Sequence, residues 1–151
     1  MVGVTASVGG LAAVRRAVAE AGRQDAVLVP VVVRSAPDDG RRPPLPESAH
    51  AALLLLDTVF ERAFGGYPHD LVIHPLVLDS PEPGRALVAA ADRPTDLLVL
   101  GGSHHGRLDR ALHGSVTRYC RTHAACDVVV VSPAELLSGP DRPVAVPAGR
   151  P

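Results

Sequence analysis

The segment from Asp96 to Ser132 constrains the fold more than any other part of the chain. Asp96 to Leu100 is an apolar run without helical periodicity that ends at Gly101-Gly102, which is typical of a strand buried on both faces. A glycine-containing loop follows, a helix is predicted from Gly114-Ser115 to about Ala124, and Asp127 to Val131 forms a second buried strand. This order of elements predicts a right-handed crossover unit of a parallel sheet.

The rest of the chain repeats this alternation. Three more strands are predicted at Met1–Thr5, Ala26–Val33 and Leu71–Leu78, and three more helices at Ser7–Gly22, Glu47–Phe64 and Pro83–Ala91. Five strands alternating with four helices predict an α/β fold: an open five-stranded parallel sheet, order 3-2-1-4-5, with helices on both faces. Pro75 then lies in an edge strand, whereas Pro30 lies in an interior strand and requires a local bulge.

The first helix shows most clearly which face is expected to be buried. Ser7 is its predicted N-cap, and Leu11, Val14, Val18 and Ala21 follow at helical spacing on one face. Gly9 and Gly10 in its first turn have two explanations, close packing of the helix on the sheet or room for a ligand, and packing is favoured. In the second helix the expected inward positions include Ala51, Leu55, Val59 and Ala63.

Composition limits the classes of partner. The chain has 151 residues and a net charge of −1, with no basic run interleaved with aromatic residues, so nucleic-acid binding is not expected. Its apolar runs are too short to span a bilayer, it has no recognisable signal peptide, and its two cysteines are too few for a disulfide scaffold. We therefore expect a cytoplasmic protein with one domain over residues 1–133 and a Pro/Gly-rich, disordered tail over residues 134–151.

A binding site is expected where the strand order reverses. In such sheets, ligands bind at the carboxyl ends of the strands, here between the first and fourth strands. The turn Thr5-Ala6-Ser7 would then face the loop from Gly101 to Ser115 across a crevice. A helix that begins at Gly114-Ser115 would leave backbone amides free to bind an anion in that crevice.

The order of the elements, together with GGSHHGRLDRALHGSVTRYC and HAACDVVVV, closely resembles the universal stress protein family over Met1 to Pro133. FGGYPHDLVIHPLVL and VLVPVVV are reminiscent of members from high-GC actinobacteria. The resemblance implies a Rossmann-like sheet of the adenine nucleotide alpha hydrolase-like type. It also implies homodimers paired through the last strand, and in one subclass a bound ATP, with Mg only alongside ATP.

The nucleotide-binding subclass of this family carries Gly-x-x-Gly-x9-Gly-Ser/Thr after the fourth strand. Gly101, Gly114 and Ser115 match this motif, whereas His104 replaces the second glycine and Ser103 replaces the arginine usual before it. Thr5 stands where the family has an acidic residue, and Val31 matches a position whose backbone contacts adenine. The cofactor-binding residues that the resemblance implies are Thr5, Ala6, Ser7, Val31, Gly101, Ser103, His104, Gly114, Ser115 and Val116.

The sequence predicts neither a metal site nor a set of catalytic residues. His104, His105 and His113 have no carboxylate or thiolate at a ligand spacing, so no metal site is predicted. Ser103 beside His104 lacks a nucleophile-elbow motif, so no catalytic residues are assigned, and slow ATP hydrolysis is the one activity worth testing.

The last strand, with Val128, Val129, Val130 and Val131, is an apolar edge. It either pairs with a second copy, which is favoured, or lies under the tail. Two functions therefore stand: a stress-response switch that binds ATP or a related adenine nucleotide, and a nucleotide-free dimeric adaptor for an unknown protein partner.

Overall fold

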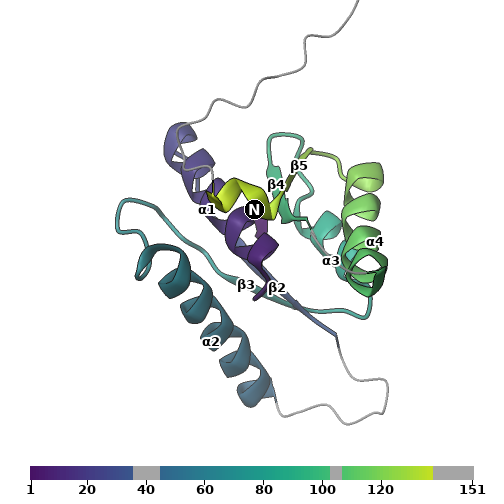
Figure 1. Cartoon of the computed structure of the whole chain (residues 1–151), viewed down its shortest axis with the longest axis horizontal. Coiled ribbons are helices and arrows are strands. Elements are labelled where there is room, and N and C mark those ends of the chain that lie inside the picture. The colour runs from purple at the N-terminus through teal and green to yellow at the C-terminus, as the bar shows by residue number, and fades with distance from the viewer. Residues whose placement is uncertain (36–44, 103–106, 138–151) are drawn as a thin grey trace, which may run out of the picture.

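The computed structural model describes residues 1–35, 45–102 and 107–137, and of 45–48 and 107–113 it describes the backbone only. The described strands form one parallel sheet in the order β3-β2-β1-β4-β5, which confirms the predicted topology (Figure 1). The strands are β1 (Val2–Gly3), β2 (Pro30–Arg34), β3 (Leu76–Asp79), β4 (Leu97–Gly101) and β5 (Asp127–Val131). The helices are α1 (Val8–Gln24), α2 (Leu45–Phe64), α3 (Pro83–Ala90) and α4 (Arg107–His123), followed by the 3-10 helix η1 (Pro133–Leu137).

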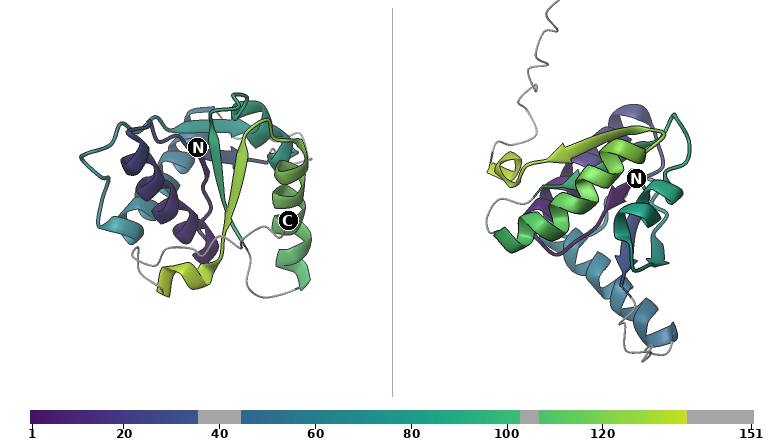
Figure 2. Two further views of the ribbon diagram at one scale, coloured as in Figure 1. Left: turned by 90° about the horizontal axis from the view of Figure 1, so that it is seen from above. Right: turned by 90° about the vertical axis from the view of Figure 1, so that its right-hand side faces the viewer.

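The helices lie in two layers, with α1 and α2 on one face of the sheet and α3 and α4 on the other (Figure 2). Neighbouring residues of each strand point to opposite faces. In β4, Val99 packs in the core beneath α1 and α2, whereas Leu98 and Leu100 pack beneath α3 and α4. Both cores are almost entirely aliphatic, and Phe60 of α2 is the largest fully buried side chain among the described residues.

Helix α1 begins as its sequence predicts and ends later. The Ser7 hydroxyl accepts a hydrogen bond from the backbone amide of Gly10 at 3.0 Å, which confirms the predicted N-cap. The expected end at Gly22 is wrong, because the helix continues to Gln24 and ends where Asp25 adopts a left-handed conformation with φ 49°. Aspartate tolerates this conformation better than most residues, so the helix can end without a glycine.

The two strand prolines share one level of the sheet. The register pairs Val31 with Leu76, so Pro30 lies level with Pro75 in the neighbouring strand. The ladder between β2 and β3 is interrupted there, with an isolated bridge between Leu28 and Ile73 on one side and continuous pairing from Val31 on the other. Neither proline has a backbone N–H to donate, and because the two lie at the same level, Pro30 can begin an interior strand. Regular pairing of β3 therefore begins at Leu76 rather than at the predicted Leu71.

Helix α2 buries a slightly different face from the one predicted. Val59 and Ala63 are buried as expected, whereas Ala51 is exposed and Leu55 is half-buried. The remaining buried side chains of the described part of this helix are Ala52, Leu56 and Phe60. The inward face is therefore rotated by one residue from the predicted face.

The chain beyond β5 returns across α1. In η1, Glu135 forms an ion pair with Arg16 of α1 at 3.7 Å, and Leu136 packs against the core beneath α1. The predicted tail begins within this 3-10 helix, which extends to Leu137, and 138–151 lie outside the described residues. Within the described chain, β5 pairs only with β4, so no described strand pairs with its other edge. None of the described helices is both long and apolar enough to cross a membrane.

Candidate functional site

The turn between β1 and α1 lies at the carboxyl edge of the sheet. Thr5 Oγ1 and Ser7 Oγ are 2.8 Å apart and share a hydrogen bond. Thr5 is half-buried, while Ala6 and Ser7 are exposed. The Ser7 hydroxyl already accepts the Gly10 amide, so both hydroxyl groups of this turn take part in local hydrogen bonds.

The first turn of α1 packs directly on the end of β4. A Cβ atom on Gly9 would overlap the carbonyl oxygen of Gly102, and one on Gly101 would overlap the backbone of Gly9. A Cβ atom on Gly10 would overlap the backbone of Thr5 in the same way. The packing explanation for Gly9 and Gly10 is therefore confirmed: helix and strand are in backbone contact, with no room for a ligand between them.

Val31 lies within the sheet rather than at its edge. Its side chain is 1% exposed, and its carbonyl oxygen accepts a hydrogen bond from the Val4 amide at 2.9 Å. The register pairs Val31 with Gly3, so the residue of β2 level with Thr5 is Val33. A role for the Val31 backbone in binding adenine stays a prediction, and Val33 is the β2 residue that lies closer to the carboxyl edge.

Helix α4 begins at Arg107, so the predicted start at Gly114-Ser115 is wrong. Only the first four amides of a helix lack partners within it, and Gly114 and Ser115 are the eighth and ninth residues of α4. The amides at Gly114 and Ser115 therefore belong to the helix interior. Any positive charge that residues 114–122 of α4 offer to an anion must come from side chains instead.

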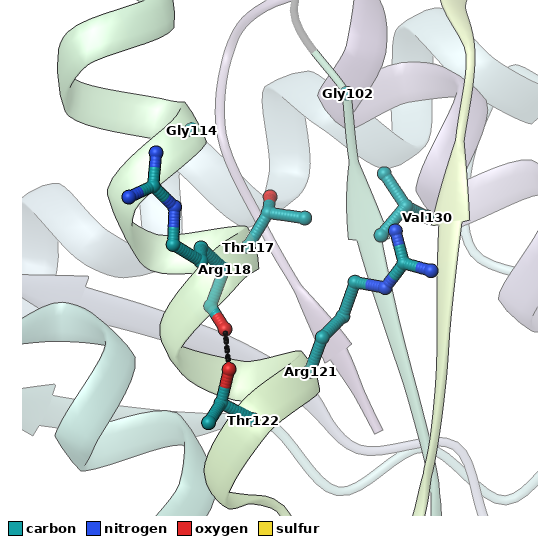
Figure 3. A pocket seen from close by; sticks show the side chains of 7 residues that line it. All are labelled: Gly102, Gly114, Thr117, Arg118, Arg121, Thr122 and Val130. Atoms are coloured by element: carbon teal, nitrogen blue, oxygen red, sulfur yellow. Dashed lines mark hydrogen bonds between the residues drawn. The ribbon is translucent and has the colours of Figure 1, made fainter.

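A pocket of about 440 Å³ lies between α4 and the carboxyl ends of β4 and β5 (Figure 3). Gly102 and Val130 form its wall on the sheet side. The wall on the helix side consists of residues from one face of α4, at positions i, i+3, i+4, i+7 and i+8: Gly114, Thr117, Arg118, Arg121 and Thr122.

Two arginines, Arg118 and Arg121, are among the described residues that line the pocket, and none of those described residues is acidic. Among the described residues, neither Arg118 nor Arg121 has an ion-pair partner, in contrast to Arg16 and Arg34. The Thr122 hydroxyl donates to the Arg118 carbonyl oxygen at 2.9 Å, which commits its proton to the helix backbone. In Figure 3, Arg121 extends from α4 toward Val130. The pocket therefore offers positive charge to a ligand that enters beside β5.

Apart from Val31, the predicted site residues divide into three groups. Thr5, Ala6 and Ser7 lie together with Gly101 on the α1 side of the β4 end. Of the residues predicted on α4, Gly114 lines the pocket, Ser115 is exposed, and Val116 packs toward the core beneath α3 and α4. Ser103 and His104 lie outside the described residues.

The sequence-based prediction missed Thr117, Arg121, Thr122 and Val130 as pocket residues, and it noted Arg118 only as a nearby cation. A signal for them is present in the sequence, since positions 114, 117, 118, 121 and 122 recur with helical periodicity and none carries an apolar side chain. A polar face on a helix that covers a sheet is the pattern that points to this pocket.

No group of three or more potential ligands of a metal occurs among the residues that the structure describes. Both cysteines are free thiols. Burial raises the pKa of the Cys120 thiol to about 11, and burial also raises the pKa of Cys126. Neither thiol is thus activated as a nucleophile.

The model of the universal stress protein family matches residues 1–132. The chain belongs to the universal stress protein family. Among solved structures, UspA from Lactobacillus plantarum shares 24% identity at a TM-score of 0.62, over 85% of this chain and 93% of that one. A universal stress protein from Archaeoglobus fulgidus shares 21% identity at a TM-score of 0.59, over 86% of this chain and 95% of that one. Both have the fold of this chain.

One further member of the family was crystallised in complex with cAMP. It shares 27% identity with this chain at a TM-score of 0.60, over 86% of this chain and 94% of that one. No curated protein matches the sequence.

Proposed function

We propose that this universal stress protein is a stress-response regulator that binds an adenine nucleotide at the carboxyl edge of its sheet. The observation that carries the proposal is the pocket beside Gly102 and Gly114, whose described lining residues include two arginines and no acidic residue. The related protein crystallised with cAMP supports adenine as the base. ATP is the proposed ligand, with Mg bound only alongside it.

In this proposal the nucleotide lies along the edge that runs from the β1–α1 turn to α4. Its binding residues are those that the family resemblance implies, including Thr5, Ser7, Gly101 and Gly114, together with the pocket residues of α4. No catalytic residue is assigned, and slow ATP hydrolysis is the activity to measure. Two free thiols suit a reducing compartment, so we propose that the protein acts in the cytoplasm.

We further propose that the protein forms a homodimer through β5. Within the described chain this strand pairs on one side only, and Val128, Val129 and Val130 are half-buried. Val131 differs, because its side chain is 1% exposed in the core beneath α1. An apolar edge strand without a partner favours pairing with a second copy. The second candidate function, a nucleotide-free dimeric adaptor, uses the same surface and needs no ligand.

Native mass spectrometry of freshly purified protein separates the two functions. The expected result is a dimer whose mass increases by one nucleotide per chain when ATP or cAMP is added. A Gly114→Val variant should lose this mass shift, because the added side chain projects into open space beside the pocket. Gly22→Val in α1 is the matched control, since it is also a helical glycine with no neighbouring atoms within 4 Å.

A dimer that binds no adenine nucleotide would contradict the binding proposal and favour the adaptor. A monomer under the same conditions would contradict the β5 interface. Loss of the nucleotide in the Gly22→Val variant as well would show that the effect of Gly114→Val comes from helix destabilisation rather than from the pocket.

A further inference from the structure

We infer that the outer face of α2 is a docking surface for a basic amphipathic helix of a partner protein. This inference goes beyond the proposed nucleotide site and the β5 dimer, because α2 covers the face of the sheet opposite α4 (Figure 2). The residues of this α2 surface are four exposed apolar side chains and two exposed carboxylates: Leu53, Leu54, Phe64, Tyr67, Asp57 and Glu61.

The exposed apolar side chains of the described chain are concentrated at this helix. Half of the large hydrophobic residues that are exposed there belong to α2 or to the turn after it, and the others are scattered over α1, η1 and the approaches to β2 and β3. In Figure 1, α2 lies at the periphery of the molecule, with α1 and the sheet on its inner side. A cluster of apolar side chains on an outer face is typical of an interaction site.

The α2 surface is distinct from the face that the helix buries in the core. Leu53, Asp57 and Phe64 occupy positions i, i+4 and i+11, which lie on one face of a helix, and all three are exposed. These positions cover three turns, or about 16 Å along the helix axis. A row of anchors with this spacing is suited to a partner helix of similar length.

The turn after α2 holds the aromatic end of the surface in place. Gly65 and Gly66 have φ values of 72° and 136°, which lets the chain reverse at the end of the helix. The Tyr67 ring then stacks on Phe60 with the ring centroids 4.5 Å apart, and its hydroxyl donates to Asp57 Oδ1 at 2.8 Å. The surface is therefore ordered before a partner arrives, which lowers the entropic cost of binding.

The charge of the surface indicates the kind of helix that binds. Asp57 and Glu61 are four residues apart on α2, where two like charges destabilise a helix slightly. Neither carboxylate forms an ion pair with any residue whose side chain the structure describes. A helix with apolar side chains on one face and lysine or arginine beside them complements both the exposed apolar side chains and the two carboxylates.

The same carboxylates disfavour two other occupants. A twofold contact between copies of this chain would place the α2 surface against itself, so Asp57 and Glu61 would face the same acidic residues of the second copy. The surface of an anionic membrane would also repel them. A basic helix is the occupant whose charge attracts this surface.

Calorimetric titration of the full chain with a synthetic peptide tests the inference. The probe is a 14-residue helical peptide, about the length of the surface plus one turn, that contains only leucine and lysine, with the leucines on one face. It should bind, whereas a counterpart with glutamate in place of lysine should not. Leu53→Ser and Phe64→Ser should each weaken binding of the lysine peptide by about tenfold, as expected for apolar anchors.

Val27→Ser is the matched control for the apolar variants. Val27 and Leu53 have the same exposed fraction, 48%, but Val27 lies outside α2, so its replacement should leave binding unchanged. Circular dichroism establishes that each variant is folded. The mass shift caused by ATP should be the same in Leu53→Ser as in the wild-type chain, which separates this surface from the nucleotide proposal.

A double charge variant tests the two carboxylates. Asp57→Asn with Glu61→Gln should weaken binding of the lysine peptide several-fold and remove most of its dependence on ionic strength. Asparagine at position 57 still offers an oxygen to the Tyr67 hydroxyl. The control is Asp25→Asn with Asp92→Asn, which makes the same change in net charge at two exposed residues outside α2.

Four results would overturn the inference. The first is no binding of the lysine peptide, or binding that Leu53→Ser and Phe64→Ser leave unchanged. The second is self-association of the full chain that Phe64→Ser abolishes, which would assign the surface to a second copy. The third is binding to phosphatidylglycerol vesicles that the same variant abolishes. The fourth is displacement of the lysine peptide by a synthetic peptide of residues 138–151, which would assign the surface to the chain's own tail.

Discussion

The end of β4 has two neighbours that differ sharply in packing. On the α1 side, Gly9 and Gly101 bring helix and strand into backbone contact that leaves no room for even one additional carbon atom. On the α4 side, Gly102 borders an open pocket, and Gly114 has no neighbouring atoms within 4 Å of a Cβ position. Glycine therefore has two uses at this edge of the sheet: close packing at the α1 contact and open space at the α4 pocket.

This contrast moves the expected site of anion binding away from the β1–α1 turn. The turn is closed by local hydrogen bonds between Thr5, Ser7 and Gly10, and by the contact of α1 with β4. The α4 side has open volume and two arginines, Arg118 and Arg121, that form no ion pair with any residue whose side chain the structure describes. A ligand that uses both regions would place its charged end beside α4 and reach the turn only with an exposed, less charged part.

The largest expected effect is on stability, from a substitution at the contact between α1 and the end of β4. Gly9→Ala places a methyl group on the carbonyl oxygen of Gly102, and neither backbone can move without separating α1 from β4. We expect a loss of about 3 kcal/mol or more in the free energy of unfolding, the upper end of overpacking effects, measured by urea denaturation. Gly22→Ala in the same helix is the control, because it meets no atom. An equally stable Gly9→Ala protein would contradict the close contact.

The next effect concerns the core beneath the pocket, at Cys120. Its side chain is 0% exposed, its thiol lies 3.7 Å from the Gly84 carbonyl oxygen, and its pKa is raised from 9.0 to about 11 by burial. The unfolded chain releases this proton at a lower pH than the folded chain does. Stability is therefore retained below about pH 9 and falls as the pH rises to about 11, by about 2–3 kcal/mol.

Comparison of the wild-type chain with Cys120→Ala isolates this contribution. The sequence contains no lysine, so few other groups titrate between pH 9 and 11. Urea denaturation at several pH values should show a smaller decrease in stability over this range for the variant than for the wild-type chain. Equal pH dependence would mean that the pKa of the thiol is not raised in the folded chain, which would contradict the burial of Cys120 in the core between α4 and α3.

The sequence carried enough information for the topology because each element has a local signal. Apolar runs ending in glycine mark β4 and β5, the Ser7 N-cap marks the start of α1, and the alternation of strands and helices implies the parallel order. The alignment of Pro30 with Pro75 could not be predicted from local sequence, because it depends on the register between two strands far apart in the chain.

The candidate site was harder to predict, and α4 shows why. Gly114-Ser115 has the composition of a helix start, but Leu108, Ala111 and Leu112 before it are good helix formers, and the helix extends through them. The source of positive charge therefore changes from backbone amides to Arg118 and Arg121. Their relevance depends on α4 turning this face toward Val130, which follows from packing and not from local sequence.

The smallest expected effect tests the comparison of the two glycine environments most directly. Gly114→Ala and Gly22→Ala each replace a helical glycine that has open space around it, so each should increase the free energy of unfolding by about 0.5–1 kcal/mol. Their effects on binding should differ, because only Gly114 borders the pocket. Gly114→Ala should weaken ATP binding while stabilising the fold, and Gly22→Ala should stabilise the fold alone. If Gly114→Ala stabilises the protein without affecting any ligand, the open space beside α4 has no role in binding, and the difference between the two sides of β4 is one of packing density only.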